Sequence, residues 1–216
     1  MKRFELEKKY EESVLHNFDR NLLHTIKFSK WNKFKWKGLT LMKDPMTLTI
    51  YQQLINDILP STIIEFGSYD GGSALWMYDV CKSLNLRTKV ITIDINKENF
   101  KCDNKEIIFF NLDVNNIVDF FNLNNSFFKN LQKPIIAIED CHVNVKQVCT
   151  QVDKFLTTGD YLVVEDTIDY NKHQTMLDFL DENPNYIVDR KYCDFWGTNN
   201  SWNINSFLIK NEKVRS

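Results

Sequence analysis

Three acidic residues stand at or just after short apolar runs in the first half of the chain: Glu65, Asp94 and Asp113. Carboxylates accept hydrogen bonds from hydroxyl and amino groups. Asp94 closes the run Ile-Thr-Ile-Asp, a position from which an acid can hold both hydroxyls of a ribose. Asp113 follows the next apolar run and can accept a hydrogen bond from the amino group of an adenine. The pattern favours a nucleoside ligand.

Half of the six glycines fall in one segment, Glu65-Phe-Gly-Ser-Tyr-Asp-Gly-Gly-Ser73. A glycine-rich turn between a buried strand and a helix lets the backbone approach a ligand. The spacing matches neither the dinucleotide fingerprint nor a P-loop, and the acidic Glu65 disfavours phosphates. The alternative is that Glu65, Asp94 and Asp113 only cap strand ends and bind no nucleoside, and both interpretations stay open here. The predicted cofactor-binding residues are Glu65, Gly67, Ser68, Gly71, Gly72, Ser73, Asp94 and Asp113.

A second acidic cluster comes from two later runs, Ile138-Glu-Asp-Cys-His142 and Val163-Val-Glu-Asp-Thr167. Neighbouring parallel strands lie ~4.8 Å apart, so residues at their ends can converge on one ion. Clustered carboxylates repel one another unless a cation neutralises them, and their oxygens suit Mg²⁺ or Mn²⁺ better than zinc. The alternative is a set of acids that cap helices or pair with lysines. A lone histidine such as His142 is weak support for a site.

Short apolar runs alternate with amphipathic stretches, which predicts repeated β-α-β units and a parallel sheet with helices on both faces. We therefore expect an α/β, Rossmann-like, doubly wound sheet with a helical N-terminal extension. Strands are predicted at 62–66, 89–94, 106–111, 134–139 and 161–165, with a closing strand pair at 186–190 and 205–210. Helices are predicted from 45 to 58 and at 73–84, 115–131, 143–156 and 172–181.

The first 44 residues hold 11 Lys and Arg against 6 Asp and Glu, while the remainder holds 16 against 23. We divide the chain into an extension, 1–43, that acts as a lid or oligomer contact, and one domain, 44–216. Basic and aromatic residues alternate from 27 to 37, and an acidic domain is a poor platform for nucleic acid. Five cysteines without a C-x-x-C pair, a charged N-terminus and no long apolar run predict a cytoplasmic protein.

The glycine-rich turn with the acids that follow it resembles class I S-adenosylmethionine-dependent methyltransferases. Three longer segments resemble the cephalosporin hydroxylase / rhamnosyl O-methyltransferase family, from about 44 to 210: Asp160-Tyr-Leu-Val-Val-Glu-Asp-Thr167, Glu139-Asp-Cys-His-Val-Asn144 and Phe195-Trp-Gly-Thr-Asn-Asn-Ser-Trp-Asn-Ile-Asn205. The resemblance implies paired metal ligands at Glu165 and Asp166, with a third carboxylate from Glu139 or Asp140. Counting back from Gly159 without gaps places Glu139 at the position of the family's metal-binding aspartate. Matching by residue type instead favours Asp140 as that ligand.

By this resemblance we expect Mg²⁺- or Mn²⁺-dependent transfer of methyl from S-adenosylmethionine to a hydroxyl of a small polyhydroxylated or natural-product-like acceptor. A nitrogen acceptor stays open. His142 and Asp140 are the predicted catalytic residues, with His142 taking the proton. Two alternatives are a non-catalytic S-adenosylmethionine-binding module and a small-molecule hydroxylase component. We expect a homo-oligomer, no membrane association and no nucleic-acid partner.

Overall fold

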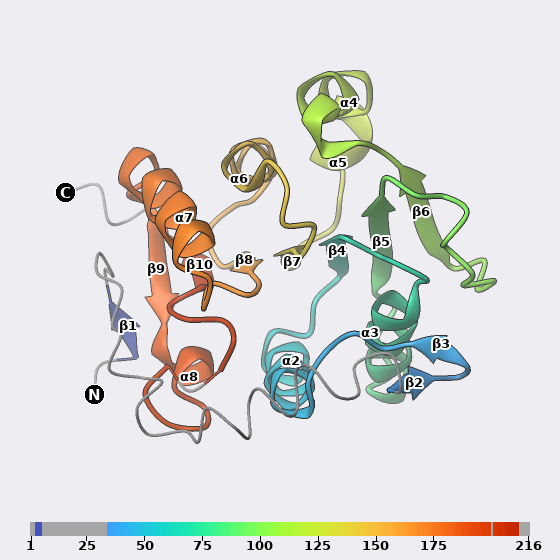
Figure 1. Cartoon of the computed structure of the whole chain (residues 1–216), viewed down its shortest axis with the longest axis horizontal. Coiled ribbons are helices and arrows are strands. Elements are labelled where there is room, and N and C mark those ends of the chain that lie inside the picture. The colour runs from blue at the N-terminus through green and yellow to red at the C-terminus, as the bar shows by residue number, and fades with distance from the viewer. Residues whose placement is uncertain (1–2, 6–33, 200, 212–216) are drawn as a thin grey trace.

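The computed structural model describes residues 3–5, 34–199 and 201–211. Its centre is an eight-stranded sheet in the order β1-β9-β10-β8-β7-β4-β5-β6 (Figure 1). The five strands β8, β7, β4, β5 and β6 are parallel, and β10 lies antiparallel between β8 and β9. The predicted doubly wound, mostly parallel α/β sheet is therefore confirmed.

The strands fall close to the predicted ranges because each is a short run of β-branched and aromatic residues. The parallel strands are β4 (Thr62–Phe66), β5 (Lys89–Asp94), β6 (Ile107–Asn111), β7 (Ile135–Glu139) and β8 (Tyr161–Val164). The remaining strands of the sheet are β9 (Tyr186–Asp189), β10 (Phe207–Lys210) and the two-residue β1 (Phe4–Glu5). Every residue of β4 and β7 is buried, as expected for strands covered on both faces.

Helices cover both faces of the sheet, with α4, α5, α6 and α7 on one side and α2, α3 and α8 on the other (Figure 1). Their bounds are α2 (Pro45–Ile58), α3 (Gly72–Ser83), α4 (Ile117–Leu123), α5 (Asn125–Lys129), α6 (Val145–Asp153), α7 (Tyr170–Glu182) and α8 (Arg190–Cys193). The start of α2 is fixed by Asp44, whose carboxylate accepts from the backbone of Met46 and Thr47.

The single helix predicted over 115–131 is divided into the 3-10 turn η3 (Val114–Asn116) and helices α4 and α5. Asn124 separates the two helices, and its side-chain amide donates to the carbonyl of Phe120 at 2.8 Å. Asparagine competes in this way with the backbone of a continuing helix. The apolar periodicity persists across the break, so Phe121 and Phe128 still pack edge to face in one core cluster.

The longer described part of the N-terminal extension, residues 34–43, contains a hairpin, not a helix, formed by β2 (Lys35–Trp36) and β3 (Leu39–Thr40). It packs on α3, where the indole of Trp36 donates to Asp79 at 2.7 Å. The backbone N–H of Thr40 also donates to Asp70 at 2.7 Å. Residues 34–43 are thus packed into the domain, which corrects the expectation of a helical extension over this part. Apart from residues 3–5, the rest of the predicted lid, including Phe28 and Trp31, lies outside the described residues.

Within the described ranges, no helix has the length and apolar character needed to cross a lipid bilayer. All five cysteines are free thiols.

Candidate active site

A cavity of about 420 Å³ opens at the carboxyl ends of the parallel strands β4, β5, β6, β7 and β8. This is the edge at which ligands bind in open α/β sheets. Nine of the predicted site residues line it: Gly67, Ser68, Ser73, Asp94, Asp113, Asp140, His142, Glu165 and Asp166. Four others do not: Glu65, Gly71, Gly72 and Glu139. The topology therefore gathers acids from four separate strand ends into one space.

The glycines of the β4–α3 turn are required mainly by close packing within the protein. Gly67 has a φ of +103°, and a Cβ there would lie 2.5 Å from the carbonyl oxygen of Asp140. A Cβ on Gly72 would lie 2.1 Å from the carbonyl oxygen of Thr40. Gly71, with a φ of +92°, faces Phe100 in the same way. The turn is thus pressed between the end of β7 and the N-terminal hairpin, and only Gly67 faces the cavity.

Glu65 lies beneath the turn with no exposed surface. The hydroxyl of Thr92 donates to it at 3.1 Å and also shares a 2.6 Å hydrogen bond with Ser68. Burial raises the pKa of Glu65, and the nearby ammonium of Lys43, 3.9 Å away, opposes that rise. Glu65 therefore lies beneath the cavity and does not line it.

Asp94 and Asp113 line the cavity and also shape its loops. Asp94 accepts from the backbone N–H of Tyr69 at 2.9 Å and from that of Asn96 at 2.8 Å. Asp113 accepts from the backbone of Asn115 at 2.9 Å. Carboxylate oxygens have more than one lone pair, so these contacts leave capacity for a ligand hydroxyl or amine.

The carboxylates at the ends of β7 and β8 surround a buried lysine. The ammonium of Lys43 lies 2.7 Å from Asp140 and 2.7 Å from Glu165, and only 2% of its side chain is exposed. The hydroxyl of Tyr51 donates to the same oxygen of Glu165 at 2.6 Å. Sequence analysis missed Lys43, since a lysine just before a helix start carries no signal that it points inward.

Burial and charge act in opposite directions on this cluster. Burial lowers the pKa of Lys43, but the neighbouring carboxylates outweigh it and hold that pKa well above its ordinary value. Burial raises the pKa of Asp140, and Lys43 and His142 more than offset this effect and lower it to about 2. For Glu165, burial and then the charge of Asp140 raise the pKa to about 8. The cluster thus holds an excess of negative charge that one ammonium only partly compensates.

Glu139 and Asp140, left as alternatives by the sequence, have different surroundings. Glu139 is fully buried, and its carboxylate pairs with the ammonium of Lys172 at 2.8 Å. Its other oxygen accepts from the backbone of Cys141 at 3.1 Å and His142 at 3.0 Å. Asp140 instead faces the cavity. Glu139 therefore holds the loop that presents Asp140 and His142.

His142 and Asp166 form one wall of the cavity. Both have positive φ values, 58° and 54°, which are uncommon for residues with side chains and cluster at functional sites. Nε2 of His142 lies 3.4 Å from Asp140 and 3.7 Å from Asp166. The ammonium of Lys172 lies 3.0 Å from Nδ1. Since an ammonium can only donate, Nδ1 accepts and the ring proton of neutral His142 resides on Nε2.

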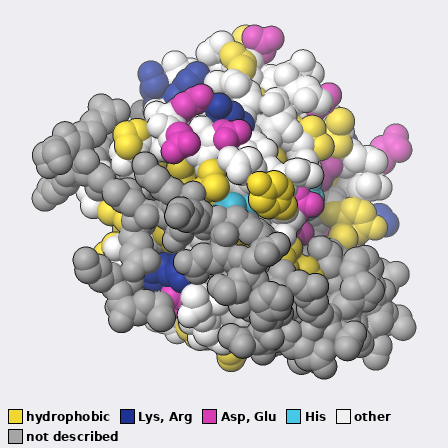
Figure 2. Space-filling view, turned by 60° about the vertical axis from the view of Figure 1, so that its left-hand side comes forward, with side chains coloured by type: hydrophobic (Ala, Val, Ile, Leu, Met, Phe, Trp, Pro, Cys, Tyr) yellow, Lys and Arg dark blue, Asp and Glu magenta, His cyan; other side chains and the backbone are white. Residues whose placement is uncertain are grey.

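The space-filling view shows a small histidine surface recessed among apolar and acidic side chains (Figure 2). The side chain of His142 is 49% exposed, whereas His173 is buried. His142 is therefore open to a ligand.

One oxygen each from Asp140 and Asp166 and one nitrogen from His142 lie within 4.8 Å of one another. Two hard carboxylate oxygens at this separation, with Glu165 adjacent, suit a small divalent cation that keeps water ligands. The residues present thus fit the metal that the sequence predicted.

The strand order and the acids at the strand ends define the class I S-adenosylmethionine-dependent methyltransferase architecture. The sequence model of the family described as Rhamnosyl O-methyltransferase/CmcI matches residues 28–210. The chain belongs to this family.

Curated relatives support this membership. A rhamnosyl O-methyltransferase of Mycobacterium leprae (strain TN) is 30% identical over 153 residues, which is 69% of this chain and 66% of that protein. The chain thus spans just under two thirds of that relative. A rhamnosyl O-methyltransferase of Mycobacterium bovis (strain BCG / Pasteur 1173P2) is 25% identical over 205 residues, 84% of this chain and 80% of that protein.

Solved structures show the same fold. An apo structure of CmcI superposes with a TM-score of 0.72 at 24% identity and covers 95% of this chain and 86% of that one. A CmcI structure with Mg and S-adenosylmethionine gives a TM-score of 0.71 at 24% identity over the same shares of both chains.

Proposed function

We propose that this protein transfers the methyl group of S-adenosylmethionine to a hydroxyl of a small polyhydroxylated or natural-product-like acceptor, with a Mg²⁺ or Mn²⁺ ion bound. The observation that carries the proposal is that one cavity holds both the nucleoside-type acids Asp94 and Asp113 and the Asp140, His142 and Asp166 cluster. The relatives' names and the titles of the related structures support it.

In this proposal Asp94 accepts the ribose hydroxyls, Asp113 meets the adenine amino group, and the turn at Gly67 and Ser68 borders the amino acid part. Asp94→Ala removes up to two hydrogen bonds to the ligand, each worth ~0.5–1.5 kcal/mol or more when charged. Calorimetry should show S-adenosylmethionine binding weakened about tenfold. Asp119→Ala, at an exposed helix position, is the control. Unchanged affinity of the Asp94 variant would rule out the assignment of the ribose site.

Asp140, Glu165 and Asp166 would hold the metal, and Glu139, predicted as a candidate ligand, is left out because it pairs with Lys172. When bound, such a cation polarises the acceptor hydroxyl and lowers its pKa. The chain's own residues supply two positive charges nearby, from Lys43 and Lys172, that limit repulsion among the carboxylates.

Methyl transfer forms an oxygen–carbon bond, breaks the sulfonium–carbon bond and releases the hydroxyl proton. We assign that proton to His142, with Asp140 beside it to stabilise the charged ring. Because Lys172 donates to Nδ1 and Nε2 already carries a proton, His142 takes up the second proton at Nδ1 once that nitrogen turns from Lys172. Lys172 therefore orients the imidazole ring and competes with the acceptor's proton for the lone pair of Nδ1.

Both alternatives differ from the proposed transferase in one product. A non-catalytic module forms no S-adenosylhomocysteine, and a hydroxylase component forms none either. An iron site of two histidines and a carboxylate receives no support, since within the described part of the chain the cavity is lined by His142 alone among histidines. Mass spectrometry of S-adenosylhomocysteine, with and without Mg²⁺ over a panel of hydroxyl and amine acceptors, separates the transferase from both alternatives.

We keep three further predictions as proposals: a small-molecule acceptor, a homo-oligomeric assembly and a cytoplasmic location. The free thiols agree with a reducing compartment.

A further inference from the structure

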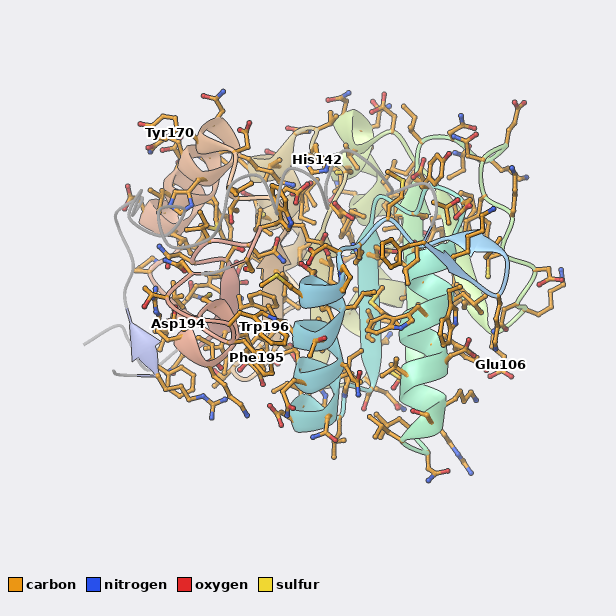
Figure 3. All side chains as sticks on the ribbon, turned by 60° about the horizontal axis from the view of Figure 1, so that its bottom comes forward. Glu106, His142, Tyr170, Asp194, Phe195 and Trp196 are labelled. Carbon is orange, nitrogen blue, oxygen red and sulfur yellow. The ribbon has the colours of Figure 1, made fainter. Side chains whose placement is uncertain are left out.

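The asparagine-rich segment 195–205 begins far from the candidate active site and reaches it near its end. Figure 3 shows Phe195 and Trp196, just after α8, well apart from His142. Trp202, further along the same segment, lines the cavity. The segment therefore crosses the molecule from α8 to the edge of the sheet that carries the site.

Two asparagines anchor this segment to α8. The backbone N–H of Asn199 donates to Asp194 at 2.7 Å, and that of Asn205 donates to the amide oxygen of Asn199 at 3.1 Å. Arg190 donates to Asn205 at 2.6 Å and pairs with Asp194 at 2.8 Å. Asn199 and Asn205 have φ values of 48° and 52°, which asparagine tolerates better than most residues. These contacts give the segment a fixed path.

The end of the segment runs alongside the loop that follows β8. The backbone N–H of Ile168 donates to the carbonyl of Trp202 at 2.9 Å. The hydroxyl of Thr167 donates to the carbonyl of Ile204 at 2.8 Å. The antiparallel pairing of β8 with β10 is thus continued, past the strand ends, by contacts to the loop that carries Asp166.

Asn203 makes the contact to Asp166 itself. Its side-chain oxygen accepts from the backbone N–H of Asp166 at 2.9 Å, and only 1% of Asn203 is exposed. Asp166 has a φ of 54°. This left-handed conformation is unfavourable for a residue with a Cβ, so it persists only where surrounding contacts impose it. The hydrogen bond to Asn203 is such a contact, and it acts on a residue whose carboxylate lies within 4.8 Å of ligand atoms of Asp140 and His142.

We propose that Asn203 is a positioning residue for the metal site: by accepting the N–H of Asp166, it holds the backbone conformation that presents the Asp166 carboxylate beside Asp140. This inference rests on the proposed function and adds what orients one of its metal ligands. Asn203 does not line the cavity, so it acts through Asp166. Groups that support a metal ligand in this way typically raise metal affinity about 10- to 100-fold.

The test measures binding of Mn²⁺ alone to the full chain, from the loss of the free-ion EPR signal, in the wild type, Asn203→Leu and Thr167→Val. Leucine keeps the branched shape of asparagine but accepts no hydrogen bond. The amide nitrogen of Asn203 has no hydrogen-bond partner among the described residues, so the substitution removes chiefly the contact to Asp166. Thr167→Val is the matched control, because it removes another buried hydrogen bond between the same two segments at a residue that does not line the cavity.

We expect both substitutions to lower Tm, since each removes a buried hydrogen bond. Only Asn203→Leu should weaken Mn²⁺ binding, by about tenfold or more. Affinity for S-adenosylmethionine, measured by calorimetry without metal, should be equal in all three proteins. If Asn203→Leu fails to fold, Asn203→Ala replaces it, with the same loss of the accepting oxygen and the same expected result.

Wild-type Mn²⁺ affinity in a folded Asn203 variant would overturn the positioning role and leave the proposed methyl transfer standing. An equal loss of affinity in Thr167→Val would also overturn it, because the loop as a whole, and not Asn203, would then set the site. If the wild type itself binds no Mn²⁺, this inference and the proposed metal site fail together. Formation of S-adenosylhomocysteine without added metal then tests methyl transfer separately.

Discussion

Lys43 is the residue on which the acidic cluster depends when no cation is bound. Its ammonium contacts Asp140 and Glu165 and lies near Glu65, in a place with almost no solvent. Removing one partner from a buried charge cluster leaves the rest uncompensated, which costs ~3–5 kcal/mol. A divalent cation at the same carboxylates restores part of that loss.

Lys43→Met should therefore unfold at a clearly lower temperature than the wild type in the presence of chelator. Because its carboxylates lack their ammonium, added Mg²⁺ should raise Tm more in the variant than in the wild type. Scanning calorimetry with and without Mg²⁺ measures both effects. Lys37→Met, which removes an exposed partner of Asp79, is the control and should change stability by ~0–1 kcal/mol. If the Lys43 variant is as stable as this control, repulsion among the buried carboxylates does not lower the stability of the protein.

His173 in α7 is the described residue whose charge state ties stability to mild acid. Burial lowers its pKa from 6.5 to about 4, and a backbone hydrogen bond to Ile204 opposes this only partly. A histidine with a lowered folded pKa contributes stability above pH 6.5, and that contribution is lost as the pH falls toward 4. Each pKa unit corresponds to ~1.4 kcal/mol, so the loss over this range is about 3 kcal/mol.

Denaturant unfolding between pH 7.5 and 4 should thus show the wild type losing stability below pH 6.5 relative to His173→Gln. The comparison of the two proteins is needed because the raised pKa of Glu165 acts in the opposite direction, and equally in both. His173→Gln keeps a hydrogen-bond donor without a titratable ring. The slope of its unfolding free energy against pH should be smaller than that of the wild type by the equivalent of about one bound proton per molecule. Parallel pH curves for the two proteins would contradict the prediction.

At the scale of elements, the β4–α3 turn and the loop after β7 fix each other's positions. The backbone N–H of Asp140 donates to the carbonyl of Phe66 at 2.8 Å, next to the close approach of Gly67. The N–H of Glu165 donates to the carbonyl of Glu139 at 2.9 Å. The ends of the three neighbouring strands β4, β7 and β8 are thereby held in register, which fixes the positions of Asp140 and Glu165 at the cavity.

Gly67→Ala should disturb this lock, because the new Cβ meets the Asp140 carbonyl and the φ of +103° is unfavourable for alanine. We expect a loss of stability of ~2–5 kcal/mol together with weaker binding of both S-adenosylmethionine and Mg²⁺. Gly159→Ala is the matched control: its φ is +94°, and nothing lies within 4 Å of its Cβ. That variant should lose only ~1–2 kcal/mol and keep ligand affinity. Equal effects of the two substitutions would mean that backbone conformation, and not contact with Asp140, limits position 67.

At the scale of the whole molecule, the N-terminal segment contributes to the domain at two places. Arg3 pairs with the buried Asp189 beside β1, and the hairpin of residues 34–43 packs on α3 and delivers Lys43. The division of the chain at residue 43 predicted from composition therefore separates Lys43 from the carboxylates it contacts.

Two truncations test this organisation. A chain lacking residues 1–33 keeps the hairpin and Lys43, whereas one lacking residues 1–43 loses both. We expect the longer truncation to have the lower Tm and a weakened affinity for S-adenosylmethionine, because Gly72 and Asp70 lose their packing partner Thr40. Thermal melts and calorimetry on both chains decide this. The prediction is wrong if the two truncations behave alike.

The sequence by itself determined the alternation of strands and helices and the order of acids at the strand ends. Runs such as 62–66 and 135–139 carry apolar residues at both odd and even positions, and this local property already predicts strands buried on both faces. Asp94, Asp113, Asp140 and Asp166 follow from the same logic, since parallel strands place their carboxyl ends at one edge of the sheet. The family resemblance rested on the segments 139–144, 160–167 and 195–205.

Tertiary structure alone decided which neighbour of a pair faces the ligand and which cation sits among the acids. Glu139 and Asp140 are adjacent in sequence, but the end of β7 turns one toward Lys172 in α7 and the other toward the cavity. Lys43 reaches the carboxylates from 97 and 122 residues away, and Gly72 is required by a hairpin that lies earlier in the chain. Such contacts depend on how distant elements pack in three dimensions, and no local pattern of residue types records them.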